Sequence, residues 1–370
     1  MKLTFISFLS SLAVAFGQHN PLVCINTSDF AADFDFFPHK VNATISEYWD
    51  IQYFPTYKIL RNELQAYDYV LYQCGTAPPT LNLSDTTTTM VAVPLQSGCG
   101  ITSTTAIPFL ELLGARTQMK AWLGDAFGTD YISSSCVKQL LSDGEFLIVP
   151  DPSNSSSPGV LALLALNGSG QDLVAFSDSD TLFSDVSISE SSETTSLGIL
   201  EWIKFYSAFF NLEAIANQVF GDVAARYDCV IGNAQATSAT DSQNKPIAVW
   251  AYYSNYSGEN GFDVAECPNY YCDYADACSA TLLNSREGSI IINNTYGGPP
   301  FVYMNITEFV EFAKGADHWF YPSDNWDIAY KDFKNEFAAL PSVQNQRVFD
   351  NLRNGGIDSW FENRLAQPGK

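Results

Sequence analysis

The chain has 370 residues and carries 41 acidic against 18 basic side chains, which gives a formal net charge of −23. This balance argues against nucleic acid as a partner, because contacts with phosphates need clustered lysine and arginine. The length is sufficient for two domains that each bury a core, and we interpret the acidity first as a solubility feature and second as a field that attracts cations.

The first residues have the pattern of a secretory signal peptide. Lys2 is followed by the mostly apolar segment 5–16, and Ala15-Phe16-Gly17 fits the small-x-small cleavage pattern. The apolar run is too short to span a bilayer, no other segment is long enough to do so, and 365–370 has no hydrophobic tail for a lipid-anchor signal. We therefore expect a signal peptide over 1–17, no transmembrane segment, and a mature chain that is secreted and extracellular.

Strand and helix patterns alternate between residues 18 and 195. Short apolar or aromatic runs predict strands at 49–54, 57–60, 67–73, 90–95, 119–123, 146–149 and 173–176. Helices are expected from Pro108 to Gly114, from the serines at 133–135 through Leu141, and over 160–166. The polar segments 97–105, 151–159 and 177–196 are interpreted as loops. Alternating elements of this kind imply a mostly parallel sheet covered by helices.

The segment 196–227 has the longest helical pattern in the chain. It contains no proline, and its apolar residues recur at steps of three to five, close to the period of an α-helix. One helix over this segment would be about 45 Å long at 1.5 Å per residue, well above the average globular helix. We interpret it as a spacer that separates two lobes and leaves a cleft between them. The alternative is a buried core helix of one large domain.

The alternating pattern restarts after this helix. Strands are expected at 247–253, 289–292, 318–321 and 347–349, and helices at 277–284, 306–314 and 326–337. A long irregular loop is expected over 254–273, and Asn305-x-x-Glu308 resembles a capping box. The predicted fold class is therefore α/β, with two Rossmann-like lobes of mostly parallel sheets (18–195 and 228–370) joined by one long spacer helix (196–227).

Eight Asn-x-Ser/Thr sequons support an exported, glycosylated protein, and each is expected on the surface. Their asparagines are Asn26, Asn42, Asn82, Asn154, Asn167, Asn255, Asn293 and Asn305.

The chain has eight cysteines, and an even count in an oxidising compartment favours disulfides. Cys267, Cys272 and Cys278 lie in one short tyrosine-rich segment, so at least one local bridge is expected there, with Cys229 as the partner of a remaining member. Zinc is the less favoured alternative, because the spacing is not C-x2-C and no histidine is nearby.

Four segments together resemble the class III, long-helix family of bacterial extracytoplasmic solute-binding proteins, which serves iron–siderophore, haem, cobalamin and metal uptake. The stretch 49–76 contains Y-F-P-T-Y-K and Y-V-L-Y-Q-C-G-T, and S-T-T-A-I-P-F-L-E-L-L-G at 103–114 is similar to the family's first-lobe loop and helix. S-L-G-I-L-E-W-I-K-F-Y-S-A-F-F-N at 196–211 resembles its spacer helix, and S-V-Q-N-Q-R-V-F-D at 342–350 its last strand. The segment 177–187 is shorter than in that family, so a helix of the first lobe is expected to be missing.

The resemblance implies a two-lobed fold and a small solute bound in the cleft. It does not identify the solute, and for a secreted, sequon-rich chain it implies neither a membrane transporter nor a receptor as partner. We expect a monomer with no cofactor of its own.

Ligands in open α/β sheets bind at the carboxyl ends of strands, which selects the candidate ligand-binding residues. In the first lobe these are Ser103, Thr104, Thr105, Trp122, Gly124, Asp125 and Tyr131. In the second lobe they are Tyr252, Tyr253, Asn255, Tyr256, Tyr321 and Asp324. Hydroxyls near a helix start suit an anionic or carbonyl oxygen, and tyrosine and tryptophan combine apolar contact with one hydrogen bond. For each aromatic residue, ordinary packing is the competing interpretation.

Direct metal binding needs converging histidines and carboxylates, and the chain has only His19, His39 and His318. We therefore favour an organic chelate stacked on aromatic side chains, or Fe³⁺ held by Tyr and Asp oxygens, over a bare metal held by three histidines.

An extracellular, carbohydrate-active hydrolase is the alternative function. The sequence has no G-x-S-x-G, H-E-x-x-H or G-x-x-x-x-G-K-[ST] motif, but it has paired carboxylates at Asp125/Asp130, Asp178/Asp180 and Asp273/Asp276. Cys99 or Cys136 with His318 could form a nucleophilic pair, although disulfide bonding is the better use of both thiols. We expect a binding protein, not an enzyme, with no catalytic residues.

Overall fold

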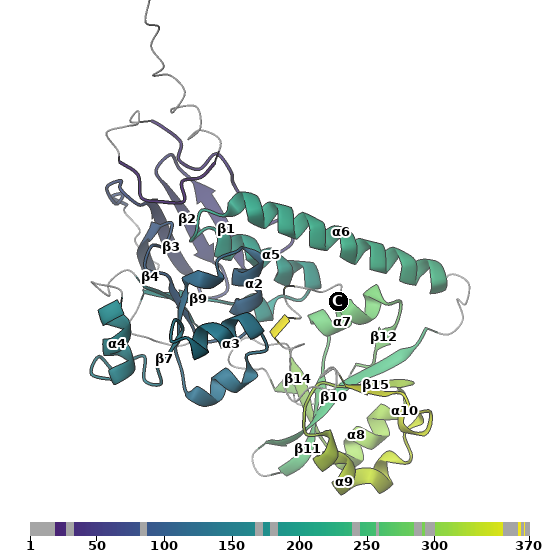
Figure 1. Ribbon diagram of the computed structural model, residues 1–370. Helices are drawn as coiled ribbons and strands as arrows, with labels where there is room; N and C mark the ends of the chain where they lie inside the picture. Colours follow the sequence, from purple (N-terminus) through teal and green to yellow (C-terminus); the bar gives the residue numbers. More distant parts are fainter. Residues whose placement is uncertain are drawn as a thin grey trace, which may run out of the picture. The chain divides into compact units, whose positions relative to one another are not determined.

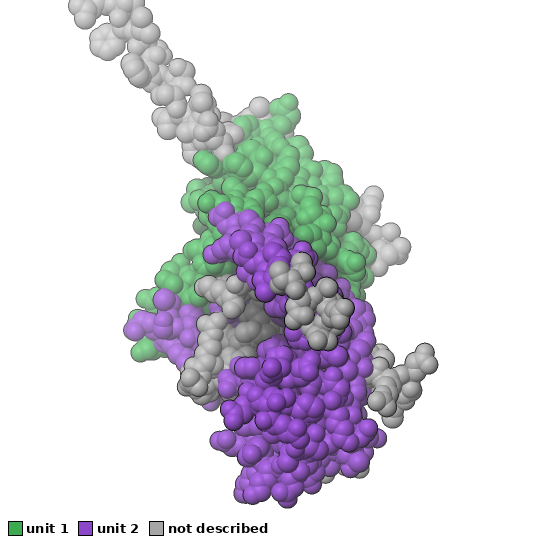
Figure 2. Space-filling model, turned by 90° about the vertical axis from the view of Figure 1, so that its right-hand side faces the viewer, with its two compact units in different colours: residues 1–126, 140–188, 201–221 green, residues 127–139, 189–200, 222–370 purple. Residues whose placement is uncertain are grey.

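The computed structural model describes residues 19–26, 33–81, 87–166, 173–177, 184–238, 245–256, 259–284, 291–292, 300–350, 362–363 and 366. The expected signal peptide and the sequons at Asn82, Asn167 and Asn293 lie outside these residues. The chain divides into two compact units, which Figure 2 shows in different colours. Unit 1 comprises residues 1–126, 140–188 and 201–221, and unit 2 comprises 127–139, 189–200 and 222–370.

Unit 1 opens with a four-stranded sheet. Its strands are β1 (Trp49–Tyr53), β2 (Tyr57–Asn62), β3 (Tyr67–Gln73) and β4 (Thr87–Val93), in the order β1-β2-β3-β4. The first three pair antiparallel, and β3 and β4 pair parallel. Alternate residues of β2 are buried, as expected for a strand with one face on a core. The strands predicted in this region are confirmed.

The second sheet of unit 1 is entirely parallel and confirms the α/β class. It contains β5 (Cys99–Ile101), β6 (Met119–Trp122), β7 (Leu147–Ile148), β8 (Val174–Ser177) and β9 (Ser184–Ser187). The helices α2 (Ala106–Leu112), α3 (Ser135–Ser142) and α4 (Pro158–Leu166) lie between these strands in the chain, as predicted.

Two strands of this sheet fall in segments that the sequence analysis interpreted as loops. β5 lies within 97–105 and β9 within 177–196. Both are short, and Cys99, Gly100 and Ile101 are all buried, so they give no alternation to detect. β5 forms by pairing with β6 and β8 on either side, whereas β9 is an edge strand that pairs with β8 alone.

The single helix predicted over 196–227 is wrong, because this segment contains two helices. α5 covers Ser196–Ser207, and α6 covers Glu213–Ser238 and continues eleven residues past the predicted end (Figure 1). Between them, Asn211 adopts a left-handed backbone conformation with φ of 57°, which no residue of a continuous α-helix adopts. Both helices are divided between the two units, α5 after Leu200 and α6 after Gly221.

Unit 2 contains a seven-stranded mixed sheet. Its strands are β10 (Ile247–Tyr256), β11 (Glu259–Ala265), β12 (Thr281–Leu282), β13 (Ile291–Ile292), β14 (Phe301–Asn305), β15 (His318–Tyr321) and β16 (Val348–Asp350). The order is β13-β14-β11-β10-β15-β16, with β12 paired to β10. The first part of β10 pairs parallel with β12 and β15, and its second part pairs antiparallel with β11. The expectation of mostly parallel sheets therefore holds for the five-stranded sheet and not for this one.

The helices of unit 2 are α7 (Tyr270–Ala277), α8 (Ile306–Ala313), α9 (Trp326–Phe337) and α10 (Pro341–Gln344). The predictions for α8 and α9 are confirmed, including the capping box of Asn305 and Glu308. The loop expected over 254–273 and the helix expected over 277–284 are wrong. Residues 259–265 form a strand instead, and α7 starts earlier because Asn269 accepts hydrogen bonds from the backbone N–H groups of Tyr271 and Cys272.

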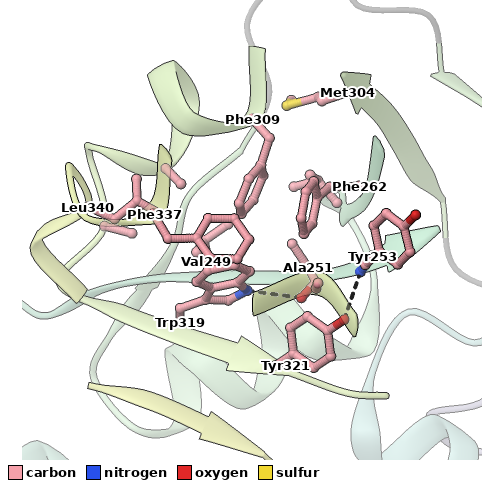
Figure 3. Close-up of a cluster of buried hydrophobic side chains, with 14 of the residues drawn as sticks. Val249, Ala251, Tyr253, Phe262, Met304, Phe309, Trp319, Tyr321, Phe337 and Leu340 are labelled. Carbon is pink, nitrogen blue, oxygen red and sulfur yellow. Dashed lines mark hydrogen bonds between the residues drawn. The ribbon is translucent and has the colours of Figure 1, made fainter. Parts of the chain in front are cut away.

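An aromatic core lies between this sheet and α8, α9 and α10 (Figure 3). Phe262 stacks on Phe309 with ring centroids 4.2 Å apart, and the indole N–H of Trp319 donates to the carbonyl of Ala251 at 2.9 Å. This core satisfies its indole group internally, as a buried tryptophan requires.

Two disulfides occur, Cys24–Cys74 in unit 1 and Cys267–Cys272 in unit 2. The second is the expected local bridge. Cys99, Cys136, Cys229 and Cys278 are free thiols, so the expected pairing of Cys229 with a member of the 267–278 segment is wrong. Burial on β5 raises the pKa of the Cys99 thiol to about 12, which makes it unreactive.

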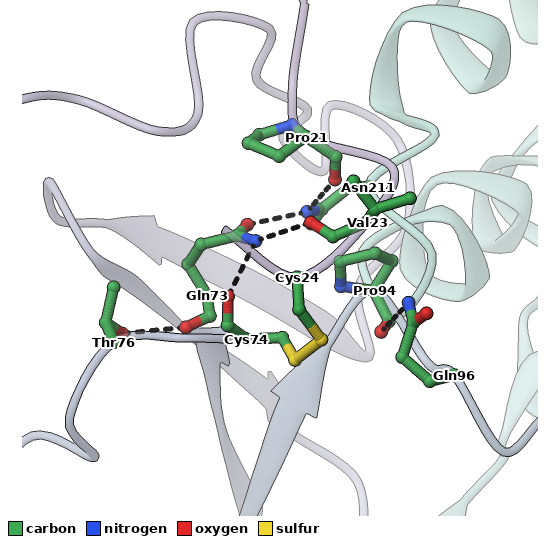
Figure 4. Close-up of a disulfide and its surroundings, with 9 residues drawn as sticks. All are labelled: Pro21, Val23, Cys24, Gln73, Cys74, Thr76, Pro94, Gln96 and Asn211. Carbon is green, nitrogen blue, oxygen red and sulfur yellow. Dashed lines mark hydrogen bonds between the residues drawn. A yellow bond between two sulfur atoms is a disulfide. The ribbon is translucent and has the colours of Figure 1, made fainter. Parts of the chain in front are cut away.

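The Cys24–Cys74 disulfide fixes the segment 19–26 to the end of β3 (Figure 4). Gln73 and Asn211 support it, because the Asn211 amide donates to Gln73 Oε1 at 2.9 Å and to the carbonyl of Pro21 at 2.7 Å. The start of the described chain is thereby tied to the break between α5 and α6. In the described part of the chain, no helix has both the length and the apolar composition needed to cross a membrane.

Candidate functional site

The five-stranded sheet of unit 1 reverses its strand order at one point. β6 and β7 follow β5 on one side, whereas β8 and β9 lie on its other side, in the order β7-β6-β5-β8-β9. In parallel α/β sheets, ligands bind beyond the carboxyl ends of the strands at such a reversal. We call the residues that follow β5 and β6, 102–105 and 123–125, the switch edge. Six of the predicted ligand-binding residues belong to it or to the strand end beside it: Ser103, Thr104, Thr105, Trp122, Gly124 and Asp125.

The loop after β5 carries four half-buried hydroxyl side chains, Thr102, Ser103, Thr104 and Thr105. Ser103 Oγ and Thr105 Oγ1 lie 2.8 Å apart and share a hydrogen bond. The backbone N–H of Thr102 donates to the carbonyl of Phe176 at 3.2 Å, which fixes the loop to β8. A hydroxyl has one donor and two acceptor positions, so hydroxyls paired in this way can still engage a further polar group.

The turn after β6 separates a packing residue from an exposed one. The indole N–H of Trp122 donates to the carbonyl of Asp125 at 3.0 Å, and the Trp122 side chain is buried at 6% exposure. Its polar group is thus used inside the turn, and the tryptophan acts as a packing residue. Asp125 is exposed and directs a carboxylate to solvent.

Close approach of the backbones at the switch edge depends on Gly100 in β5. A Cβ atom at this position would lie 2.6 Å from Leu123 Cδ1 and 2.8 Å from Leu123 Cγ. The backbone N–H of Leu123 in turn donates to the carbonyl of Ile101 at 2.8 Å. Glycine therefore permits the turn after β6 to lie directly beside the end of β5.

Tyr131, predicted to join this group, belongs to unit 2. It ends a short 3₁₀-helix over Ala126–Tyr131 and is 48% exposed. Its ring makes an edge contact with Phe127, with centroids 5.3 Å apart.

Tyr252 in unit 2 lies beside a carboxylate that the sequence analysis did not select. It pairs in register with Asp263 on β11, and its hydroxyl is hydrogen-bonded to that carboxylate. Burial raises the pKa of Asp263, although hydrogen bonds from Ser254 and Tyr252 oppose the shift. Asp263 was missed because it lies in the segment 254–273, which was interpreted as a loop. The strand alternation of 259–265 is the signal that could have found it.

Tyr253 and Tyr321 are in the core of unit 2. The Tyr321 hydroxyl accepts from the backbone N–H of Tyr253 at 3.2 Å and contacts Asn325 Oδ1 at 2.6 Å, and the residue is 1% exposed. Burial and internal hydrogen bonds engage the side chain of Tyr321, and the packing interpretation applies to it.

The remaining predicted residues are distributed over unit 2. Asn255 is exposed near the end of β10, and Asp324 is exposed in the loop before α9. Tyr256 ends β10, and its side chain lies outside the described residues.

The three histidines considered for metal binding each stack on another ring. His19 stacks on His39 with ring centroids 5.4 Å apart, and His318 stacks on Phe349. Over the residues that the structure describes, no group of three or more His, Cys, Asp and Glu side chains gathers in a way that could hold a metal ion. Asp273 accepts from the backbone N–H of Ser196 at 2.8 Å and from the Tyr227 hydroxyl at 3.1 Å, so its carboxylate holds α7 to two other helices.

No protein-family model matches the chain. An uncharacterized lipoprotein of Methanocaldococcus jannaschii is 25% identical over 225 residues, which cover 58% of this chain and 49% of that protein. The chain thus spans about half the length of the curated relative it matches.

Several solved structures are similar in fold. The periplasmic haem-binding protein HutB of Vibrio cholerae has a TM-score of 0.48 and 13% identity, over 74% of this chain and 98% of that one. The Fe³⁺-hydroxamate transport protein of Saccharomonospora viridis has a TM-score of 0.48 and 12% identity, over 73% and 91%. IsdE of Staphylococcus aureus, solved with haem, has a TM-score of 0.43 and 13% identity, over 73% and 95%. Similarity at this level does not establish a shared ligand.

Proposed function

We propose that this chain is an extracytoplasmic solute-binding protein, and that the switch edge of unit 1 forms part of its ligand site. The observation that carries the proposal is the reversal of strand order at β5, which brings Ser103, Thr105 and Asp125 to one edge of a parallel sheet. The two disulfides support a location outside the reducing cytosol.

The side chains of the switch edge favour one kind of ligand. Hydroxyls can donate to and accept from a ligand, and the exposed carboxylate of Asp125 repels anions. The formal net charge of −23 acts in the same direction at long range. The site therefore suits a neutral or cationic molecule with several oxygen or nitrogen groups.

Within the class that the sequence resemblance implies, a ferric hydroxamate chelate or another uncharged metal chelate fits this description better than a free anion. Binding of haem and of cobalamin should be compared with binding of these chelates, because each of the two presents a large apolar surface as well as polar groups.

Ligand-dependent stabilisation tests the proposal. A ligand that binds only the folded chain stabilises it by RT ln(1 + [L]/Kd), which is about 2.7 kcal/mol at a hundredfold excess over Kd. We expect a rise in the thermal midpoint with at least one member of a panel of ferric siderophores, haem, cobalamin and metal salts. A flat response to the whole panel would contradict the proposal.

A pair of variants locates the site. Replacing both hydroxyls, Ser103→Ala with Thr105→Val, removes hydrogen bonds worth about 1 kcal/mol each and should weaken binding by roughly tenfold or more. The matched control is Thr237→Val, which removes an exposed hydroxyl on α6 that donates to the carbonyl of Asn233. If the double variant and the control bind the ligand with equal affinity, the switch edge is not part of the ligand site.

A further inference from the structure

The sequons that the structure describes are all at the surface. Asn26, Asn42, Asn154, Asn255 and Asn305 are exposed, which confirms the surface expectation for these five. Two of them, Asn255 and Asn305, lie close together in unit 2 although they are fifty residues apart in the sequence.

Asn255 and Asn305 lie at one end of the seven-stranded sheet, beside the hairpin that joins β10 to β11. Asn255 pairs with Asn260 on β11, and Asn305 pairs with the next residue, Gly261. β11 alone separates their strands, so the two backbones are about 10 Å apart at the usual strand spacing. Residues of successive rows point to opposite faces of a sheet, so this end carries one sequon on each face.

The two polar atoms of the Asn305 side chain have separate functions. Oδ1 accepts from the backbone N–H groups of Thr307 and Glu308, each at 3.0 Å, and so caps α8. Nδ2 makes no hydrogen bond to any residue that the structure describes, and neither side-chain amide atom of Asn255 does so. At both positions, the nitrogen that N-glycosylation modifies is thus not used by any residue within the described part of the chain.

We infer that this end of the sheet, comprising Asn255 and Asn305 with the intervening Asn260 and Gly261, is a carbohydrate-bearing surface with an N-linked glycan on each sequon asparagine. The donor is an oligosaccharide joined to a lipid through a pyrophosphate. The bond from the anomeric carbon to the pyrophosphate oxygen breaks, the Nδ2–carbon bond forms, Nδ2 loses one proton, and the lipid pyrophosphate leaves with the electron pair. The cap of α8 is retained, because Oδ1 takes no part.

A glycan on Asn255 excludes this residue from a small-solute site. A bulky, hydrated chain on one face of the hairpin end, with a second on the other face, also keeps proteins and membranes away from this end. The Tyr252–Asp263 pair lies in the same hairpin, three rows further from its turn than Asn255.

The test uses the full chain secreted from a eukaryotic host. The secreted protein is treated with peptide N-glycosidase in ¹⁸O water, and mass spectrometry of its peptides gives the occupancy of each sequon. We expect both Asn255 and Asn305 to be occupied. Secreted protein with both positions unmodified overturns the inference, whether or not other sequons carry glycans.

Variants of the sequon at Asn305 distinguish loss of its glycan from loss of its hydrogen bonds that cap α8. Asn305→Asp keeps an oxygen for the cap but removes the acceptor nitrogen, and Thr307→Ala keeps the backbone N–H but removes the sequon. Each should lose one glycan and retain the folded chain, whereas Thr307→Ser should keep the glycan. Loss of secretion in Asn305→Asp and Thr307→Ala, with Thr307→Ser normal, still supports glycosylation at this position. An unchanged glycan count in both variants contradicts it.

Solute binding is measured separately on Asn255→Gln. Unchanged affinity is the expected result, because Asn255 carries sugar and not solute. A loss of affinity in this variant, measured on protein that lacks glycans, would return Asn255 to the solute site without bearing on the switch edge.

Discussion

The two halves of the segment 196–227 have the same helical period but different surroundings. In α5 every residue from Ile199 to Ser207 is buried, including the charged Glu201 and Lys204. In α6 most residues after Glu213 are at least partly exposed, and Ala216, Val223 and Tyr227 form the buried stripe. One half is thus a buried core helix and the other is an amphipathic helix, so a shared period does not imply a shared role.

Each of the two helices contributes a buried glutamate that is paired with a lysine, and the two pairs fix different parts of the chain. Glu213, at the first position of α6, is paired with Lys58 on β2, and both side chains are fully buried. Glu201 on α5 is paired with Lys204 and also accepts from the backbone N–H groups of Thr44, Ile45 and Ser46. The first pair sets where α6 starts, and the second fixes the approach to β1.

The largest effect is expected at the Lys58–Glu213 pair. Lys58→Met leaves the Glu213 carboxylate buried without its cation, and breaking such a pair typically costs about 3–5 kcal/mol. Burial already lowers the pKa of Lys58, and the Glu213 charge opposes that shift, so the pair is needed to keep the amine charged. We expect a large fall in the urea midpoint, followed by tryptophan fluorescence.

The exposed pair Lys314–Glu311 is the matched control. Its side chains are 48% and 65% exposed and their charged atoms are 2.6 Å apart, so Lys314→Met should change stability by at most about 0.5 kcal/mol. If the double variant Lys58→Met with Glu213→Leu recovers the stability lost in Lys58→Met, that loss arises from the unpaired charge of Glu213. Similar costs for Lys58→Met and Lys314→Met would mean that burial of the pair has no energetic importance.

The next largest effect is expected at Glu201. Hydrogen bonds to a charged group contribute about 1.5–3 kcal/mol, and Glu201→Gln removes the charge from several of them. Burial raises the pKa of Glu201, but the donors Lys204, Thr44, Ser46 and Ile45 outweigh burial and hold that pKa below its ordinary value.

The lowered pKa gives this contribution a definite pH dependence. It is present above the ordinary carboxyl pKa of about 4.3 and is lost as pH falls through the lower folded value. We expect the stability of the unmodified chain to fall more steeply than that of Glu201→Gln below about pH 4.3, as measured by urea midpoints at a series of pH values. Glu311→Gln on the exposed pair should keep the steep fall, and parallel curves for all three proteins would be evidence against the role of Glu201.

The sequence predicted the elements with a clear local signal and missed those formed by distant partners. The helix α8 was found because Asn305 and Glu308 lie three residues apart, and β3 was found from its aromatic run. β5 forms by pairing with β6 and with β8, and β8 lies far along the chain at Val174–Ser177. At the candidate site, Ser103 and Thr105 were selected because they follow the predicted strand 90–95, whereas the strand directly before them is β5, which was interpreted as a loop. Tyr321 was selected at the end of the predicted strand 318–321, and its side chain is in the core of unit 2.

The break between α5 and α6 shows the same limit, and it gives the smallest predicted effect. Asn211 occupies a left-handed conformation with φ of 57°, and its side chain contacts residues more than a hundred positions away. Its amide donates to Gln73 and to the carbonyl of Pro21, and its oxygen accepts from Lys58 at 2.9 Å. Helical periodicity contains no information about these partners.

Two substitutions at Asn211 distinguish the energetic cost of its left-handed backbone conformation from the contribution of its side-chain hydrogen bonds. Asn211→Gly loses the hydrogen bonds but adopts positive φ readily, whereas Asn211→Ala loses the same bonds and also pays the left-handed penalty of about 1–2 kcal/mol. We therefore expect Asn211→Ala to be less stable than Asn211→Gly by about 1 kcal/mol, measured as the difference between their urea midpoints. If alanine were the more stable of the two, α5 and α6 would have fused into one helix in that variant, and the break would depend on the side chain of Asn211 alone. Amide hydrogen exchange at residue 211 distinguishes these cases, because fusion would place its N–H in a helical hydrogen bond to the carbonyl of Ser207.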